Sequence, residues 1–138
     1  MDEPATLSID EEKKELYELL RKRLGGEDTK FAFLLAMSYG YVNKARMPLR
    51  KKMSWVRASY LNDQDRCLMV AVALAESDEV KPEQANMRAV FAIAEEFARG
   101  GIALLREVLE SPTDFHQRLI TDVLCIEELR TTTVERVE

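Results

Sequence analysis

The chain has 138 residues, a length that suits one domain able to bury about two thirds of the surface of its unfolded form. Hydrophobic residues make up 46% and charged residues 33%, which is typical of a globular protein and excludes a disordered one. The formal net charge is −5, and the longest apolar stretch, from Phe31 to Val42, is too short to cross a bilayer. We therefore expect no membrane partner.

The N-terminal third is predicted to form two helices. Residues 1–7 are expected to be frayed, and the segment Ser8-Ile9-Asp10-Glu11 has the pattern of a capping box that starts a helix at Ser8. An apolar stripe follows at helical spacing, and Gly25-Gly26 ends it. Thr29 can cap a second helix from Lys30 to about Val42, and its nearly continuous apolar sequence predicts a central position.

The middle of the chain alternates between helices and turns. From Lys44 to Leu61 the helical pattern breaks around Pro48 and predicts a long loop, within which residues 53–60 could form a short strand. Asn62 or Asp63 can cap a third helix, which contains an apolar run from Cys67 to Ala75. Pro82 suits the first position of a fourth helix, and Gly100-Gly101 is predicted to close or bend it.

Two further helices are predicted toward the C-terminus. A short one runs from Ile102 to Glu110, and Ser111-Pro112-Thr113-Asp114 can start another, whose buried face would be Phe115, Leu119, Val123 and Ile126. Residues 131–138 are expected to be a frayed tail. The sequence thus predicts an all-α fold, a compact single-domain bundle of five or six helices with one long basic loop.

The two cysteines and the N-terminal residues indicate the cellular compartment. Cys67 and Cys125 lie among apolar neighbours, so two buried, reduced thiols are expected. The acidic start Met1-Asp2-Glu3-Pro4 lacks the basic and apolar regions of a secretory signal. We therefore expect a cytoplasmic protein.

Basic residues are concentrated in one interval of the sequence. Between Asp28 and Asp63 there are seven Lys and Arg residues and no acidic residue, so these 34 residues carry +7 and the other 104 carry −12. Trp55 and Tyr41 lie in the same interval and could stack on bases or arginines, and long loops are uncommon unless they bind something. We predict a nucleic-acid-binding site at Asn43, Lys44, Arg46, Arg50, Lys51, Lys52, Trp55 and Arg57.

Two other interpretations of the basic interval stay open. Its cations could neutralise the protein's own acidic surface, such as Asp10-Glu11-Glu12 or Glu95-Glu96, while Trp55 belongs to the core. Alternatively, the loop could dock on an acidic surface of a partner protein.

No pattern in the sequence predicts catalysis or a metal site. Glu95-Glu96 and Glu127-Glu128 lack a histidine three residues on, so a solvated helix face is expected for both. His116 has no adjacent Ser or Cys with the logic of a catalytic triad, and Asp63 and Asp65 suit a helix N-terminus. We expect no catalytic residue, no metal and no cofactor.

Three blocks of the sequence resemble a known family. They are the apolar-Gly-aromatic block from Phe31 to Tyr41 with the basic loop Asn43-Lys44-Ala45-Arg46-Met47-Pro48-Leu49 behind it, the alanine-rich block from Asp65 to Glu76, and the block from Ile93 to Ile102. These blocks are similar to small proteins associated with DNA phosphorothioation (Dnd) gene clusters. The resemblance keeps their order and spans roughly residues 31–109.

The resemblance implies a role but no chemistry. Such proteins accompany systems that replace a phosphate oxygen of DNA by sulfur, or restrict DNA that lacks this mark, in defence against foreign DNA, including phages. No catalytic residue of the family can be carried over. We therefore expect a non-enzymatic accessory protein of a DNA modification or restriction system that contacts DNA or a DNA-bound complex through its basic loop.

Expected partners are DNA and other proteins of the same defence system, and a homo-oligomer is also open. The alternative is a helical protein–protein adaptor whose basic loop docks an acidic partner surface.

Overall fold

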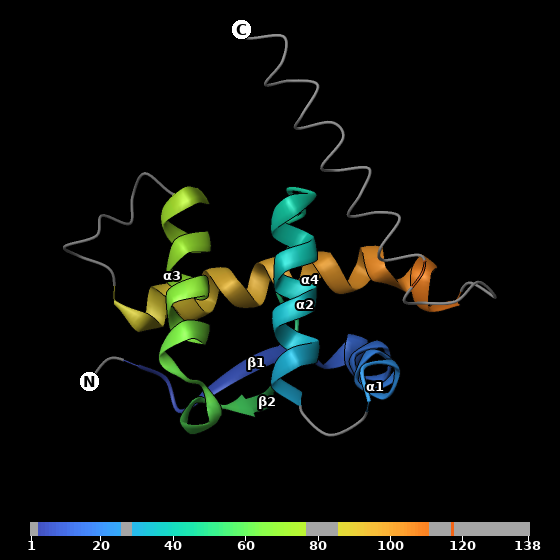
Figure 1. Cartoon of the computed structure of the whole chain (residues 1–138), viewed down its shortest axis with the longest axis horizontal. Helices are drawn as coiled ribbons and strands as arrows, with labels where there is room; N and C mark the ends of the chain where they lie inside the picture. Colours follow the sequence, from blue (N-terminus) through green and yellow to red (C-terminus); the bar gives the residue numbers. More distant parts are fainter. Residues whose placement is uncertain (1–2, 26–28, 77–85, 111–116, 118–138) are drawn as a thin grey trace, which may run out of the picture. The chain divides into compact units, whose positions relative to one another are not determined.

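The computed structural model describes residues 3–25, 29–76, 86–110 and 117. The chain divides into two compact units, residues 1–105 and 106–138, and the features below belong to the first unless stated. Single-domain organisation stays a prediction. The described elements are β1 (Thr6–Asp10), the 3-10 helix η1 (Glu11–Lys13), α1 (Lys14–Arg23), α2 (Thr29–Val42), β2 (Lys52–Arg57), the 3-10 helix η2 (Ala58–Tyr60), α3 (Asp63–Glu76) and α4 (Met87–Glu110) (Figure 1).

The described residues form four α-helices and one two-stranded antiparallel sheet, so the prediction of an all-α bundle of five or six helices is wrong. The first error is at the N-terminus. Leu7 and Ile9 are fully buried and alternate with Thr6 and Ser8, which is the period of a strand. Thr6 and Leu7 were expected to be frayed and instead belong to β1.

The helix predicted to start at Ser8 begins later. α1 starts at Lys14, after η1, and the cap of η1 is Asp10, whose side chain accepts a hydrogen bond from the Glu12 amide. The segment Ser8–Glu11 therefore does contain a helix cap, but the cap is Asp10 and not Ser8, because Ser8 belongs to the strand.

β2 is the short strand that the sequence allowed within 53–60, although it begins at Lys52 and ends at Arg57. It pairs with β1 so that Leu7 faces Val56 and Ser8 faces Ser54. Trp55 is the extra residue between these two pairs, at a β-bulge. A bulge gives the Trp55 side chain a direction different from the one it would have in a regular strand.

Two predicted helices are confirmed. α2 spans Thr29–Val42, and α3 starts at Asp63 behind an Asn62 cap. The Asn62 side chain accepts a hydrogen bond from the Asp65 amide at 2.8 Å, and the Asp65 side chain accepts one from the Asn62 amide at 2.9 Å. This reciprocal arrangement is that of a capping box.

Gly100-Gly101 does not close the fourth helix, because α4 continues unbroken to Glu110 and includes the predicted fifth helix. The glycines instead allow close contact between backbones. A Cβ on Gly101 would overlap the carbonyl oxygen of Ala36 in α2, and one on Gly100 would overlap the carbonyl oxygen of Ala45. Gly40 meets the Phe97 carbonyl in the same way. α2 and α4 therefore cross with almost no side chain between them.

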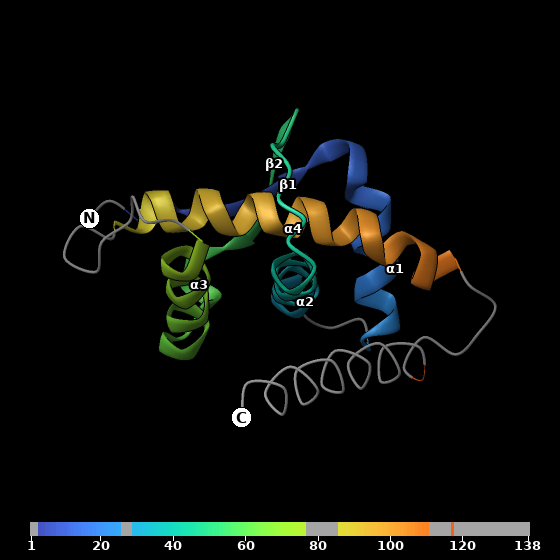
Figure 2. The same ribbon diagram turned by 90° about the horizontal axis from the view of Figure 1, so that it is seen from above.

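Two helices, α2 and α3, lie on the same side of α4 in the view from above (Figure 2). α2 and α3 stand side by side and both cross α4, in the view of Figure 1 and in the view from above in Figure 2. The face of α4 that carries Val90, Phe91, Ala94, Phe97 and Ala98 is buried. No helix in the described ranges is long and apolar enough to cross a membrane.

Exposed apolar side chains include two on α2 and α3, one of them the Cys67 thiol that was expected to be buried. Phe31 is 56% exposed, and Cys67 is an exposed free thiol on α3. Both lie on helices that are apolar on nearly all sides, where periodicity alone does not distinguish the outer face from the inner one.

Several predictions lie outside the described residues. They concern the helix start at Pro82, the start at Ser111–Asp114, the buried face Phe115, Leu119, Val123 and Ile126, the side chains His116, Cys125, Glu127 and Glu128, and the tail 131–138.

Candidate nucleic-acid interface

The segment between α2 and β2, residues 43–51, is a strap fixed to the rest of the fold. In Figure 2 its trace leaves α2 and passes over α4 to reach β2. The Ala45 amide donates to the Gly40 carbonyl at 2.8 Å, and the Met47 amide donates to the Glu96 carbonyl at 3.1 Å. At its far end the Lys51 carbonyl accepts a hydrogen bond from the Glu11 amide at 2.8 Å. The predicted long loop is therefore a short, backbone-anchored strap followed by a strand.

A buried ion pair lies beneath the end of the strap. The Asp10 carboxylate is fully buried, and its Oδ2 accepts hydrogen bonds from Arg99 Nε and from the Arg50 amide, both at 3.1 Å. Burial raises the pKa of the Asp10 carboxyl, but hydrogen bonds from the Arg50 and Glu12 amides and from Arg99 outweigh this and hold the pKa below its usual value. Asp10 thus links β1, α4 and the strap through one ionised group.

Glu95 occupies a second buried position beside the sheet. It is 6% exposed, its Oε2 accepts a hydrogen bond from the Ser8 amide at 2.6 Å, and its Oε1 lies 3.6 Å from Lys52 Nζ. Desolvation raises the pKa of the Glu95 carboxyl, and the contacts with Ser8 and Lys52 oppose this shift only in part. The expectation that Glu95-Glu96 forms a solvated face is wrong for Glu95.

Three predicted site cations pair with the protein's own carboxylates. Arg46 Nη2 lies 2.7 Å from Glu96 Oε1, and the Arg46 guanidinium is 6.0 Å from the centre of the Phe97 ring. Lys51 lies 3.0 Å from Glu11, and Lys52 pairs with Glu95 as described above. For these three residues the structure supports the interpretation that the cations neutralise acidic neighbours.

The pairs differ in how firmly they are held. The side chain of Arg46 is 38% exposed and also stacks on Phe97, whereas those of Lys51 and Lys52 are 73% and 63% exposed. Exposed ion pairs contribute little, about 0–1 kcal/mol, and exchange readily with other ions. The Lys51–Glu11 pair is of this kind, whereas the carboxylate that pairs with Lys52 is buried. Both lysine side chains are nevertheless largely exposed and accessible to an external anion, while Arg46 anchors the strap.

The remaining predicted cations are exposed. Lys44, Arg50 and Arg57 have no side-chain hydrogen bond or ion pair with another described residue. Lys44 adopts a left-handed backbone conformation with φ of 54°, directly after the end of α2. The structure brings Arg50 next to Lys51 and Lys52 at one turn and places Arg57 at the opposite end of β2.

The polar and aromatic side chains near the strap make contacts inside the fold. Asn43 caps α2 by donating its side-chain amide to the Tyr39 carbonyl at 2.8 Å. The Trp55 ring lies 5.8 Å from the ring of Tyr17, and its Nε1 donates to the Thr29 carbonyl at 3.2 Å. Tyr41 makes an edge contact with Phe97. Trp55 is half-buried, so its role is first of all a packing one.

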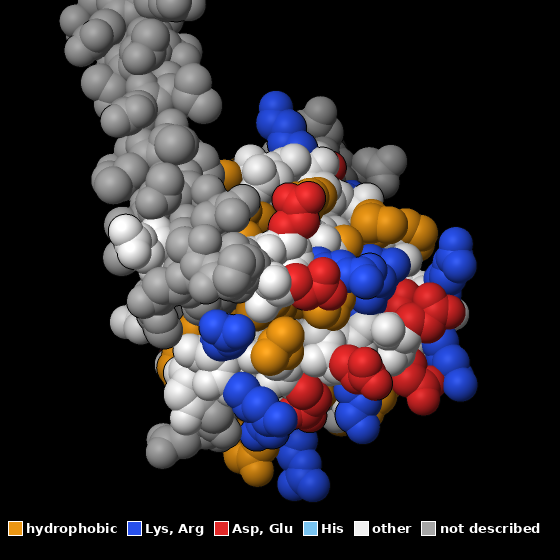
Figure 3. Space-filling view, turned by 90° about the vertical axis from the view of Figure 1, so that its right-hand side faces the viewer, with side chains coloured by type: hydrophobic (Ala, Val, Ile, Leu, Met, Phe, Trp, Pro, Cys, Tyr) orange, Lys and Arg blue, Asp and Glu red, His pale blue; other side chains and the backbone are white. Residues whose placement is uncertain are grey.

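Acidic and basic side chains are interspersed on the face of the first unit shown in Figure 3, where neither charge forms a continuous field among the described residues. The strap cations therefore act as a local cluster. A partner would be held by a few close contacts, because long-range attraction to a protein of net charge −5 is weak for an anion.

Sequence reasoning missed Arg99, and it named Asp10 and Glu95 only as acidic surface residues that the cations of the basic interval could neutralise, whereas both are buried. The available signal was Arg99, which lies four residues after Glu95 and beside the buried Ala98 on an otherwise apolar helix face. Charged residues in such a stripe are almost never buried unless they are paired. Their partner in β1 could not be found without the fold.

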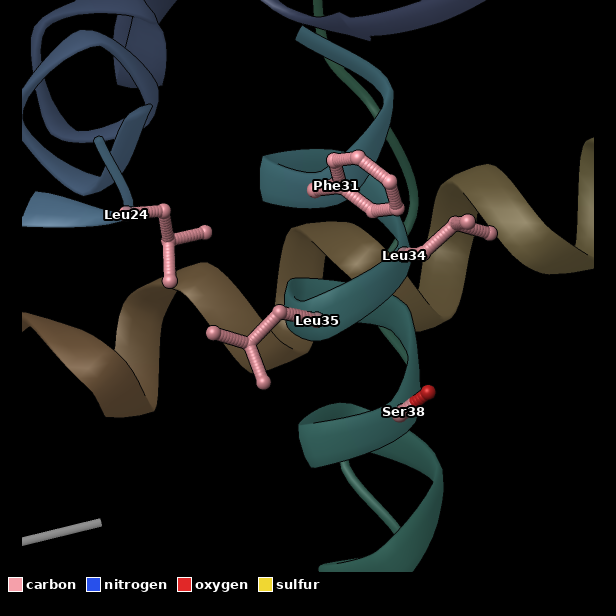
Figure 4. Close-up of a pocket in the computed structure, with 5 residues that line it drawn as sticks. All are labelled: Leu24, Phe31, Leu34, Leu35 and Ser38. Carbon is pink, nitrogen blue, oxygen red and sulfur yellow. The ribbon is translucent and has the colours of Figure 1, made fainter. Parts of the chain in front are cut away.

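A shallow apolar hollow lies apart from the strap, where the end of α1 meets α2 (Figure 4). Its volume is about 420 Å³, and it is lined by Leu24, Phe31, Leu34, Leu35 and Ser38. Lys22 and Arg23 precede Leu24 and are exposed. The hollow has no group suited to chemistry and resembles a place where an apolar side chain could dock.

Comparison with known proteins gives one result. No curated protein and no solved structure matches the chain. A family model described as DNA sulphur modification system-associated protein 4 matches residues 7–138, which is nearly the whole chain and includes β1 from its second residue, the strap and all four described helices. The chain therefore belongs to the family of DNA sulphur modification system-associated protein 4.

Proposed function

We propose that the protein is a non-enzymatic accessory factor of DNA sulphur modification that contacts DNA through the exposed cations of the strap and β2. These are Lys44, Arg50, Lys51, Lys52 and Arg57. The family association supplies the DNA context, and the contact with DNA is our own step.

The observation that carries the proposal is the anchored turn at the end of the strap. Arg50, Lys51 and Lys52 are consecutive and exposed, and the backbone of the first two is fixed by Asp10 and Glu11. A cation that is already held in place loses less conformational entropy when it binds a phosphate. Arg50 adds a planar group able to bind phosphate in a bidentate way.

Arg46 has a different role in this proposal from the one the sequence suggested. Its guanidinium is committed to Glu96 and Phe97, so it holds the strap on α4 and leaves contact with DNA to its neighbours. Asn43 and Trp55 likewise support the backbone.

The proposal predicts how steeply the affinity for DNA falls with salt concentration. If the five exposed cations each neutralise a phosphate of duplex DNA, the logarithm of the affinity falls against the logarithm of salt concentration with a slope of about −4 to −5. Replacing Arg50, Lys51 and Lys52 together by glutamine removes three contacts and makes the slope shallower by about 2.7. Glutamine is preferable to glutamate because Glu11 and Glu95 lie beside these positions.

A matched control tests whether position or net charge matters. Arg21, Lys22 and Arg23 form another run of three cations at the end of α1, and their glutamine triple changes the charge of the protein by the same amount. We expect the strap triple to weaken DNA binding and the α1 triple to leave both affinity and slope nearly unchanged. Equal effects of the two triples, or none from the strap triple, would contradict the proposal.

A second candidate function, a helical protein adaptor, is favoured by the apolar hollow on α1 and α2. Phe31 is 56% exposed at its edge. For this function, a Phe31→Ser variant should lose a protein partner that wild-type protein retains through nuclease treatment and co-purification. A partner retained by both proteins, or lost after nuclease treatment, would count against it.

A further inference from the structure

We infer that the interface takes the phosphate backbone of duplex DNA in preference to single-stranded DNA, and that the buried Asp10–Arg99 pair positions it for this purpose. The inference rests on the proposed function and adds to it the form of the nucleic acid and the residues that set the geometry.

The first argument comes from the aromatic side chains near the strap. Proteins that bind single strands without sequence preference usually offer aromatic rings on which bases stack. Here the Trp55 ring packs near Tyr17 and its N–H is bound to the Thr29 carbonyl, while Tyr41 packs against Phe97. Both rings are partly buried and are engaged with partners inside the fold, so neither is a free stacking platform.

Two aromatic residues in the described ranges are largely exposed, Phe31 and Tyr60, and Phe31 lines the hollow between α1 and α2. Tyr60 is the one that could oppose this argument. It is 62% exposed, but it lies in η2, beyond the far end of β2. The five residue steps from Lys52 to Arg57 extend over about 17 Å, so Tyr60 is well separated from the turn at Arg50–Lys52. Tyr60 therefore offers a stacking position near Arg57, at the other end of the interface, and not beside the turn.

The second argument comes from the rigidity of the turn. Asp10 accepts hydrogen bonds from Arg50 in the strap, from Glu12 in η1 and from Arg99 in α4, and the carboxylate and guanidinium are both buried. Because three elements meet at one carboxylate, the backbone that carries Arg50 and Lys51 has a fixed position. A fixed set of cations suits the regular phosphate spacing of a stiff duplex, whereas a flexible strand gains little from it.

Arg99 and Asp10 are themselves buried and reach the strap through Met47 and the Arg50 amide, so they act through the strap as positioning residues. Their effect can be separated from charge with Arg99→Lys, which keeps the charge of the protein and all the exposed cations. Arg66→Lys is the matched control, since Arg66 also joins a carboxylate, that of Glu3, to backbone carbonyls, those of Ala58 and Leu61, away from the strap.

The experiment is an anisotropy titration of wild-type protein and both variants with one short duplex and with each of its single strands at the same salt concentration. We expect wild-type protein to bind the duplex about tenfold more tightly than either strand. Arg99→Lys should lose most of this preference while its affinity for single strands stays constant, and Arg66→Lys should keep the preference. Amide hydrogen exchange at Arg50 should become faster in Arg99→Lys and stay unchanged in Arg66→Lys.

Each outcome has a defined meaning. Equal or tighter binding of single strands by wild-type protein overturns the inference and leaves the proposed function standing. A duplex preference that survives in Arg99→Lys, despite faster exchange at Arg50, overturns the positioning role. If Arg99→Lys does not fold, Asp10→Asn, which keeps an oxygen acceptor for the Arg50 amide, takes its place with the same expectations. A wild-type protein that binds neither form contradicts the proposed function and the inference together.

Discussion

At the scale of single residues, two buried carboxylates next to the strap have opposite environments. Asp10 receives three hydrogen bonds and has a lowered pKa, so it is ionised throughout the neutral range. Glu95 is desolvated and has a raised pKa, although Lys52 lies 3.6 Å from it. Glu95 is therefore the group through which pH should act on the fold.

The raised pKa of Glu95 gives a stability prediction with a definite sign. Between its unfolded value near 4.5 and its higher folded value, the folded protein binds more protons than the unfolded one, so this group lowers the free energy of unfolding as pH rises. Glu95→Gln removes this dependence. Denaturant unfolding at several pH values should show the variant gaining stability relative to wild type as pH rises above 4.5.

The exposed Glu12 supplies the control for this measurement, because Glu12→Gln changes the net charge equally. Stability curves of wild type and Glu95→Gln that stay parallel over the whole pH range would show that Glu95 is not the responsible group.

At the scale of elements, the crossing of α2 and α4 depends on glycines that the sequence suggested were helix ends. A Gly101→Ala substitution should lower the free energy of unfolding by on the order of 3 kcal/mol, since its Cβ would overlap the Ala36 carbonyl. Helix propensity alone predicts a gain of about 1 kcal/mol for the same change. Chemical denaturation distinguishes the two signs.

The reverse substitution, Ala to Gly, at an exposed helical position measures the effect of helix propensity alone. Ala71→Gly on α3 should cost about 1 kcal/mol through propensity. If Gly101→Ala is as stable as wild type or more stable, the close crossing of the two helices is contradicted.

The helices and strands differ in how well the local sequence predicts them. α2 and α3 could be predicted because a polar cap precedes a long apolar run in each. β1 could not, because its last three residues also begin the capping-box pattern Ser8–Glu11 and its partner strand lies more than forty residues away. A short strand in a small sheet is stabilised by pairing and burial, and neither is visible in local sequence.

At the scale of the whole molecule, the fold pairs more than half of the cations in the basic interval between Asp28 and Asp63. Of its seven cations, Lys30, Arg46, Lys51 and Lys52 pair with acidic residues from outside the interval, namely Asp65, Glu96, Glu11 and Glu95. The sequence located the cationic segment, and the fold decided which members are accessible. Arg50 stands out because its backbone is anchored while its side chain stays exposed.

The positions that hold the site could not be predicted from the sequence for a physical reason. Asp10 and Arg99 are separated by 89 residues, and their pairing depends on the packing of β1 against α4. A buried charge is recognised by what surrounds it, and that environment exists only in the folded chain.

The central claim, contact with DNA through the strap cations, is tested most directly by a titration of wild-type protein with duplex DNA over a range of salt concentrations. The account predicts saturable binding whose logarithmic salt slope is about −4 to −5 and becomes shallower in the Arg50, Lys51 and Lys52 glutamine triple. Absence of binding at low salt, or a slope near zero, would contradict it.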